Sequence, residues 1–164
     1  MVSIMNEALE LEAGQKVLEV GTGCGWHAST VAEIVASSDM PKNKWGHVYT
    51  IEIVPKLAET ARRNIKQIGY DNRVTVIHGD GSEGDSKEAP FDRILVTAAA
   101  PHVPPPLKEQ LKTGGIMVIP VGNIGFYQTL LKLRKIDDKI LEEDLGGVAF
   151  VPLTGKHGHT VNWY

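Results

Sequence analysis

Three glycines at alternate positions, Gly21, Gly23 and Gly25, follow an apolar run that carries Glu19. Glycine tolerates positive φ and has no Cβ, so a ligand can approach the backbone closely there. A helical pattern over residues 26–35 follows at once, and the free N–H groups at a helix start favour a carboxylate or a phosphate. Strand, glycine turn and helix together predict the opening unit of a nucleotide-binding α/β fold.

Two further acidic residues stand where later strands are expected to end. Glu52 follows the strand predicted over residues 47–51, and Asp80 lies between two glycines after the strand predicted over residues 73–77. An acid at the tip of the second strand is placed to accept hydrogen bonds from ribose hydroxyls. Asp80 could accept from an adenine amino group in the same way. The alternatives are a solvent-facing glutamate and a plain turn.

Other reactive side chains are less informative. Cys24 could be a nucleophile at a helix start, where thiol pKa values fall, but it also suits a glycine loop as a small residue. His27 and His78 are expected near the rim of the ligand site, and neither is needed as a base. His157 and His159 without further ligands are weak evidence for a metal, so no metal is predicted. No Ser/His/Asp set or carboxylate pair stands out, and no catalytic residue is predicted.

The composition is that of an ordinary globular protein. A chain of 164 residues is long enough for one domain, residues 1–164, that buries about 70% of its unfolded surface. The net charge of −3 and the lack of a basic stripe argue against a nucleic-acid partner. A single cysteine excludes an internal disulfide and fits a reducing, cytoplasmic location. We find no leader peptide and no apolar run of membrane-spanning length, and we expect a monomer.

Apolar periodicity and breaker residues place the elements. Strands that alternate with helices, followed by a hairpin-like pair, predict a mainly parallel, doubly wound sheet with at least one antiparallel strand at its end. Leu57, Ala61, Ile65 and Ile68 are expected to form the packing stripe of the third helix, and Trp45 to pack where the second strand begins. We expect helices over residues 3–11, 26–35, 55–68 and 104–111, and strands over 16–20, 47–51, 73–77, 92–97, 116–121, 128–136 and 147–153.

The glycine spacing distinguishes two kinds of ligand. Dinucleotide dehydrogenases favour G-x-G-x-x-G, whereas here Trp26 stands where the third dinucleotide glycine would fall. The pattern E-x-G-x-G-x-G resembles the first motif of S-adenosylmethionine-dependent methyltransferases, whose loop wraps the methionine end of the cofactor. The resemblance implies cofactor contacts from the acid and the loop, namely Glu19, Gly21, Thr22, Gly23, Cys24 and Gly25.

Several stretches together resemble one methyltransferase family. They are residues 17–25, 79–81, 89–92 with 96–101, 110–115 with 119–122, and 151–153. Over residues 1–158 the chain is similar to the protein-L-isoaspartate O-methyltransferases of archaeal or bacterial style. The resemblance implies a seven-stranded Rossmann-like sheet whose last two strands are exchanged relative to the usual methyltransferase order. It also implies S-adenosylmethionine as cofactor, S-adenosylhomocysteine as product, and repair of isoaspartyl peptides and proteins by methylation.

The resemblance and the strand ends together give the remaining site residues. Small residues after the fourth strand would leave room beside the sulfonium. Further cofactor contacts are expected from Glu52, Ile53, Asp80, Gly81, Thr97 and Thr154. The channel where peptide meets methyl group is expected to be lined by Ala98, Ala99, Ala100, Val151, Pro152 and Leu153.

The chain departs from the family pattern in three places. The family carries an N-terminal segment with a Ser or Thr that touches cofactor and substrate, and no such segment precedes Met1 here, so we expect slow methylation or none. The loop over residues 37–46 is longer than usual, and Asp85 replaces an expected aromatic residue. Two alternatives therefore stay open: a cofactor-binding domain without catalysis, and a methyltransferase for another small acid. An RNA substrate is disfavoured by the lack of a basic stripe.

Overall fold

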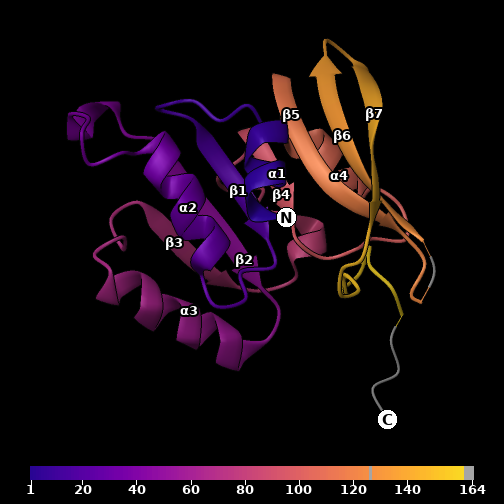
Figure 1. Cartoon of the computed structure of the whole chain (residues 1–164), viewed down its shortest axis with the longest axis horizontal. Coiled ribbons are helices and arrows are strands. Elements are labelled where there is room, and N and C mark those ends of the chain that lie inside the picture. The colour runs from indigo at the N-terminus through magenta and orange to yellow at the C-terminus, as the bar shows by residue number, and fades with distance from the viewer. Residues whose placement is uncertain (126, 161–164) are drawn as a thin grey trace.

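The computed structural model describes residues 1–125 and 127–160 of the chain. Within them, seven strands form one sheet in the order β3-β2-β1-β4-β5-β6-β7 (Figure 1). β1 to β5 are parallel, and β6 is antiparallel to both of its neighbours. The predicted sheet is confirmed, with β6 between β5 and β7. The strands are β1 (Lys16–Val20), β2 (His47–Glu52), β3 (Val74–His78), β4 (Phe91–Val96), β5 (Leu111–Gly122), β6 (Gln128–Ile136) and β7 (Lys139–Val148).

Helices cover both faces of the sheet. Side chains alternate between the two faces of a strand. On β1, Val17 packs with the buried residues of α1, α2 and α3, whereas Leu18 packs with those of α4. In the described part of the chain no helix has the length and apolar character needed to cross a membrane. The helices are α1 (Val2–Ala8), α2 (Trp26–Val35), α3 (Pro55–Gln67) and α4 (Pro105–Gln110).

The buried stripe of α3 differs from the predicted one. Ala61 and Ile65 are buried as expected, and Ala58 joins them. Leu57 and Ile68 are 41% and 54% exposed, so their predicted place in the stripe is wrong. A helical stripe through residues 58, 61 and 65 leaves position 57 on the flank of the helix, because successive residues are about 100° apart.

The last strands also differ from the sequence prediction. β5 begins at Leu111 rather than at Ile116. The sequence prediction placed a break at Gly114, but this residue, with φ of 81°, lies inside an irregular stretch of the strand. The last strand, predicted over residues 147–153, is β7 over Lys139–Val148. Its mostly exposed, acidic side chains hide the strand pattern, since an edge strand that packs on little core needs no apolar alternation.

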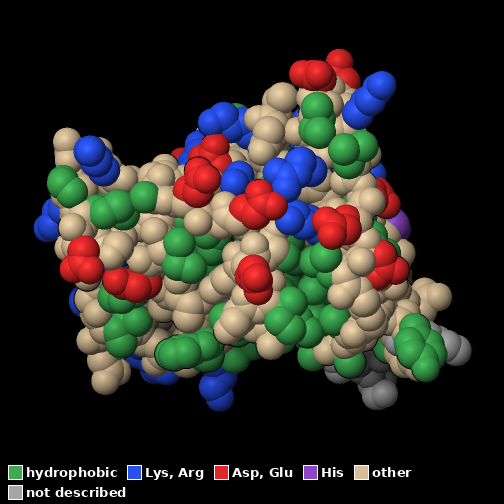
Figure 2. All heavy atoms as spheres, turned by 45° about the horizontal axis from the view of Figure 1, so that its top comes forward, with side chains coloured by type: hydrophobic (Ala, Val, Ile, Leu, Met, Phe, Trp, Pro, Cys, Tyr) green, Lys and Arg blue, Asp and Glu red, His purple; other side chains and the backbone are tan. Residues whose placement is uncertain are grey.

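Arg93 fastens the end of α1 to the sheet. Its Nε donates to the Leu9 carbonyl at 2.5 Å and its Nη2 to the Glu10 carbonyl at 3.0 Å. The Glu10 carboxylate in turn lies 2.8 Å from Lys132 and 2.6 Å from Arg134 of β6. Hydrogen bonds from Arg134 and Lys132 lower the pKa of Glu10 to about 2. On the face drawn in Figure 2, acidic and basic side chains are interspersed in this manner.

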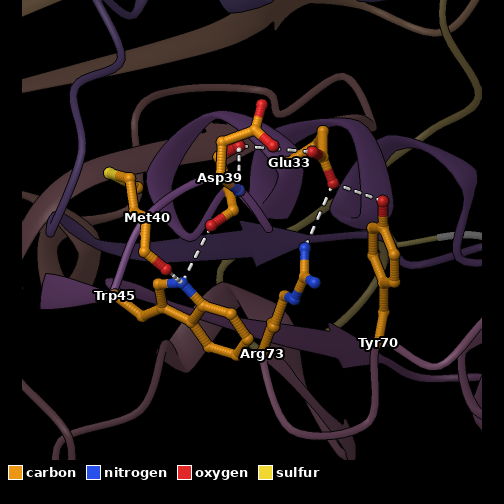
Figure 3. Close-up of polar contacts among 7 residues, drawn as sticks. Glu33, Asp39, Met40, Trp45, Tyr70 and Arg73 are labelled. Atoms are coloured by element: carbon orange, nitrogen blue, oxygen red, sulfur yellow. Dashed lines mark hydrogen bonds and ion pairs between the residues drawn. The ribbon is translucent and has the colours of Figure 1, made fainter. Parts of the chain in front are cut away.

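A second polar cluster joins α2 to the start of the parallel strands (Figure 3). Glu33 of α2 accepts hydrogen bonds from the Tyr70 hydroxyl and from Nη1 of Arg73, the latter at 3.1 Å. The Arg73 guanidinium lies over the rings of Trp45 and Tyr70, at 4.4 and 4.5 Å. The Trp45 indole donates to the Ser37 carbonyl at 2.8 Å, and its ring packs against the core as predicted.

We expect Glu33→Leu to destabilise the fold by roughly 1–3 kcal/mol. The Arg73 side chain is only 9% exposed, so removal of its partner leaves a poorly hydrated charge. Urea unfolding measures the loss. The double variant with Arg73→Leu should recover part of it, because no unpaired charge then remains. Lys112→Leu, which breaks a more exposed ion pair with Asp92, serves as the control and should cost less than about 1 kcal/mol. An equal cost in the control would contradict this role of Glu33.

Candidate functional site

A cavity of about 530 Å³ opens at the carboxyl ends of the parallel strands. Ligands bind at this edge of open α/β sheets, and the volume lies in the range of small-molecule sites. The lining is mainly apolar, and Glu52 is its one acidic residue. Its residues are Val20, Gly21, Gly23, Ile51, Glu52, Ile53, Val54, Leu57, Gly81, Thr97, Ala98, Val151, Pro152, Leu153 and Thr154.

The glycine loop borders the cavity between β1 and α2. Gly21 has φ of 97°, and a Cβ there would lie 2.4 Å from Oγ1 of Thr97. That hydroxyl donates to the Gly21 carbonyl at 2.7 Å. Gly25, with φ of 87°, is the N-cap of α2. The loop can therefore lie tightly against Thr97, which follows β4, while Gly21 and Gly23 line the cavity.

Glu52 holds the glycine loop and faces the cavity at once. Its Oε2 accepts from the Gly23 N–H at 2.9 Å and its Oε1 from the Val54 N–H at 3.0 Å. Each carboxylate oxygen has a second lone pair. Glu52 can thus accept hydroxyl hydrogen bonds from a ligand without releasing the backbone.

Glu19 lies beneath the loop and does not line the cavity. It is fully buried, and its Oε2 accepts from the Thr50 hydroxyl at 2.5 Å. The hydroxyls of Thr50 and Thr22 are 2.6 Å apart, so a polar chain connects Glu19 to the loop. Burial raises the pKa of Glu19 to about 8, against the lowering effect of the Thr50 hydrogen bond. Glu19 is therefore largely protonated at pH 7, and its expected contact with the cofactor stays a prediction.

Asp80 is also outside the cavity lining, although its neighbour Gly81 is part of it. Its Oδ1 accepts from the backbone N–H and the hydroxyl of Ser82, and its Oδ2 from the Lys156 N–H. The carboxylate thus accepts three hydrogen bonds from the protein itself, and the expected contact with an adenine amino group stays a prediction.

The alanine turn contributes one side chain to the cavity rather than three. Ala98 lines it, while Ala99 and Ala100 are fully buried. The Ala99 N–H donates to the Val151 carbonyl at 2.8 Å, and the Ala99 carbonyl accepts from the Leu153 N–H at 2.7 Å. Ala99 therefore ties residues 151–153 to the sheet through its backbone and does not line this cavity, and its place in a substrate channel stays a prediction.

The remaining predicted residues divide in the same way. Ile53, Thr97, Thr154 and residues 151–153 line the cavity, and Val151 is 70% exposed. Sequence reasoning missed Val20, Ile51, Val54 and Leu57. The apolar pair Ile53 and Val54, directly after Glu52, was the sequence signal for part of this lining, because apolar residues exposed at a strand end often mark a binding site. Three predicted loop contacts do not line the cavity, namely Thr22, Cys24 and Gly25.

Neither His27 nor Cys24 lines the cavity. His27 bonds to Oδ1 of Asn6 at 2.8 Å, and burial lowers its pKa to about 4, so it is neutral at pH 7. Cys24 is exposed and outside the lining. Among the described residues no group of three or more His, Cys, Asp or Glu side chains could hold a metal ion.

Comparison with known proteins shows the family to which this chain is similar. Residues 1–158 match the sequence model of protein-L-isoaspartate(D-aspartate) O-methyltransferase. Curated proteins named protein-L-isoaspartate O-methyltransferase are 53% identical in Hyperthermus butylicus and 54% identical in Korarchaeum cryptofilum, each over 96% of this chain. The chain spans 66% and 72% of the lengths of these two relatives.

Solved structures of the same family have a similar fold. A protein-L-isoaspartate O-methyltransferase structure superposes with a TM-score of 0.85 at 28% identity, over 96% of this chain and 47% of that one. A structure from Plasmodium falciparum, assigned to the same enzyme and bound to S-adenosyl-L-homocysteine, has a TM-score of 0.77 at 25% identity. It matches 93% of this chain and 71% of its own length.

The protonated Glu19 predicts a pH dependence of stability. Its pKa in the folded protein, about 8, exceeds the ordinary value of 4.5, so between these two values the folded protein holds a proton that the unfolded chain has lost. Stability therefore falls as pH rises, by at most ~1.4 kcal/mol per pH unit. We expect Glu19→Gln to flatten this slope between pH 7 and 8, where His27, whose ordinary pKa is 6.5, is mostly neutral in both states.

Urea unfolding at several pH values measures this effect. The exposed Glu7→Gln is the matched control and should retain the slope of the unchanged protein. If Glu19→Gln unfolds with the same pH dependence as the control, Glu19 is ionised in the folded state and the assignment of its proton is wrong.

Proposed function

The chain belongs to the protein-L-isoaspartate(D-aspartate) O-methyltransferase family, and we propose that it transfers a methyl group from S-adenosylmethionine to the carboxylate of L-isoaspartyl residues. The observation that carries the proposal is the cavity at the carboxyl ends of the parallel strands. The glycine loop, Glu52 and the alanine turn meet there, and they were expected to do so from three separate parts of the sequence.

The lining suits the parts of such a cofactor. Glu52 supplies two carboxylate oxygens for ribose hydroxyls, and it is already oriented by Gly23 and Val54. Ile53, Val54 and Leu57 offer an apolar wall for a flat adenine ring. Gly21 and Gly23 let the methionine part approach the backbone. We assign these roles to the lining residues, and the cofactor contacts expected of Glu19 and Asp80 stay predictions.

The proposed reaction requires correct positioning of the reactants rather than proton transfer by the protein. An isoaspartyl carboxylate has a reference pKa of about 3.9 and is an ionised nucleophile at pH 7. The cofactor supplies an activated methyl group, and its positive charge is lost on transfer. The residues of this chain therefore act by holding the reactants in line and by excluding water. This agrees with the lining in the described part of the chain, which holds one acidic residue, Glu52, and no histidine or lysine.

The acceptor peptide is placed at the open side of the cavity. Ala98 leaves space there, and residues 151–153 form the neighbouring wall, with Val151 largely exposed. We propose that the chain acts as a cytoplasmic monomer on isoaspartyl peptides and proteins, with no part for nucleic acid or membrane. The interspersed charges in Figure 2 support this, because a nucleic-acid site needs a surface of one sign.

Glu52→Gln tests the cofactor assignment. A glutamine places an NH₂ donor against one of two backbone N–H groups and removes the charge that strengthens ligand hydrogen bonds. Such bonds contribute about 1.5–3 kcal/mol, so the Kd for S-adenosylhomocysteine should rise about tenfold to a hundredfold in calorimetric titration. Glu59→Gln, an exposed change on α3, is the control. Equal affinities for the two variants would exclude Glu52 from the cofactor site.

A transfer assay tests the substrate. With labelled S-adenosylmethionine, a peptide that contains isoaspartate should be methylated, and the same peptide with normal aspartate should not. Glu52→Gln should slow the reaction at limiting cofactor. Cofactor binding without transfer to any acceptor would favour the binding-domain alternative. Transfer to a small carboxylic acid but not to the peptide would favour a different methyltransferase.

A further inference from the structure

The glycine loop, residues 21–25, is held by hydrogen bonds from several elements of the fold. The Glu52 carboxylate accepts from the Gly23 N–H at 2.9 Å. The Thr97 hydroxyl donates to the Gly21 carbonyl at 2.7 Å. Both bonds fix the first half of the loop, which lines the cavity. The second half does not line it, and a different element holds it in place.

A side chain of α3 holds this second half. Nδ2 of Asn64 donates to the Cys24 carbonyl at 2.9 Å, although the two residues are 40 positions apart in the chain. Among the residues that the structure describes, this is the one side-chain hydrogen bond to Cys24. Asn64 is exposed and is not part of the cavity lining. It therefore acts on the loop from outside the cavity.

The loop and α3 are also packed directly against each other. Gly25 has φ of 87° and is the N-cap of α2. A Cβ at Gly25 would lie 3.1 Å from Cδ1 of Ile65 and 3.5 Å from the Ala61 carbonyl. Ala61 and Ile65 are buried in the core on one face of the sheet. The core thus fixes the helix face that meets the loop, and Asn64 projects from a rigid support.

The first turn of the same helix borders the cavity. Val54, the N-cap of α3, and Leu57 both line it. The Glu52 carboxylate accepts from the Val54 N–H at 3.0 Å, in addition to its bond with the loop. The 13 residues of α3 extend over about 20 Å. One helix therefore sets the distance between the apolar wall of the cavity and the second half of the glycine loop.

We propose that Asn64 is a positioning residue, which fixes the peptide unit between Cys24 and Gly25 so that the glycine loop fits the amino-acid part of the cofactor. The inference rests on the proposed function for the identity of the cofactor. An amide suits this task because a backbone carbonyl is an acceptor and needs a donor. Once the donor is removed, the first half of the loop stays tied, whereas the second half is free to shift.

Two substitutions remove the donor in different ways. Asn64→Ala leaves the Cys24 carbonyl to water, and it favours the helix because alanine has the highest helix propensity. Its urea midpoint should stay near that of the unchanged protein, so weaker binding cannot come from unfolding. Asn64→Asp keeps the shape of the side chain but places a carboxylate oxygen against the carbonyl, which repels it. Asn43→Asp makes the same change at an exposed residue that precedes β2 and is the matched control.

Nuclear magnetic resonance reports on the contact itself. We expect the carbonyl carbon of Cys24 and the amide nitrogen of Gly25 to shift in both Asn64 variants, because both atoms belong to the peptide unit that accepts the hydrogen bond. The Gly21 amide, which is bonded to β2, should keep its resonance. Asn43→Asp should shift none of these signals. Unchanged Cys24 and Gly25 resonances in Asn64→Ala would overturn the proposal.

Two ligands separate a shift of the loop from a general loss of binding. S-adenosylhomocysteine carries the amino-acid part, whereas 5′-methylthioadenosine has the same nucleoside without it. In calorimetric titration we expect Asn64→Ala to raise the Kd for S-adenosylhomocysteine about threefold to tenfold, the range of one hydrogen bond, and Asn64→Asp to raise it further. The Kd for 5′-methylthioadenosine should not change in either variant.

The titrations distinguish failure of this role from failure of the proposed function. An equal rise for both ligands would show that Asn64 acts on the whole cavity, and an unchanged Kd for S-adenosylhomocysteine would leave it a purely structural residue. Either result would overturn the proposal. If the unchanged protein binds neither ligand, the proposed function fails and the positioning role fails with it, even where the resonances show that Asn64 holds the loop.

Discussion

The hydrogen bond between the Gly23 N–H and the Glu52 carboxylate is the contact on which the cavity depends. It joins the loop after β1 to the end of β2, two strands paired in parallel register from Lys16 with His47 to Val20 with Ile51. This register places the ends of β1 and β2 side by side. The Glu52 carboxylate therefore reaches the Gly23 N–H only when the two strands pair in this register. The N-terminus of α2 then lies against the same edge. A sheet fixed by apolar packing thus presents a charged acceptor at one defined point.

The two glutamates of this region have opposite electrostatic environments. Glu19 is fully buried and Glu52 raises its pKa further, because two carboxylates close together resist simultaneous ionisation. Glu52 receives two backbone N–H bonds and borders the cavity. Glu19 is therefore structural and largely protonated, whereas Glu52 is the acid that we propose accepts hydrogen bonds from the ligand. The polar chain through Thr50 and Thr22 lets the buried acid support the loop without facing the ligand.

The cavity is completed by segments that are distant in the chain. Residues 151–154 reach it only because Ala99 offers a backbone N–H and a carbonyl at the end of β4, and because Asp80 binds the turn that follows. Catalysis by alignment requires such walls to be rigid, since small errors in the approach of reactants reduce the rate greatly. The apolar clusters on the two sheet faces fix the strands, and the polar contacts at the strand ends fix the walls.

The sequence by itself determined the strands and helices of the parallel half, the glycine loop, and the place of Glu52. These features depend on local periodicity, on breaker residues, and on the rule that strand ends gather at one edge of a parallel sheet. The tertiary structure alone decided the burial of Glu19, the backbone role of Ala99, the exposure of Leu57 and the partner of Asp80. The tertiary structure also decided where β7 lies, because an acidic edge strand lacks the apolar alternation from which a strand is predicted. Each of these features depends on a contact between residues far apart in the chain, and the local sequence pattern does not indicate the partner in such a contact.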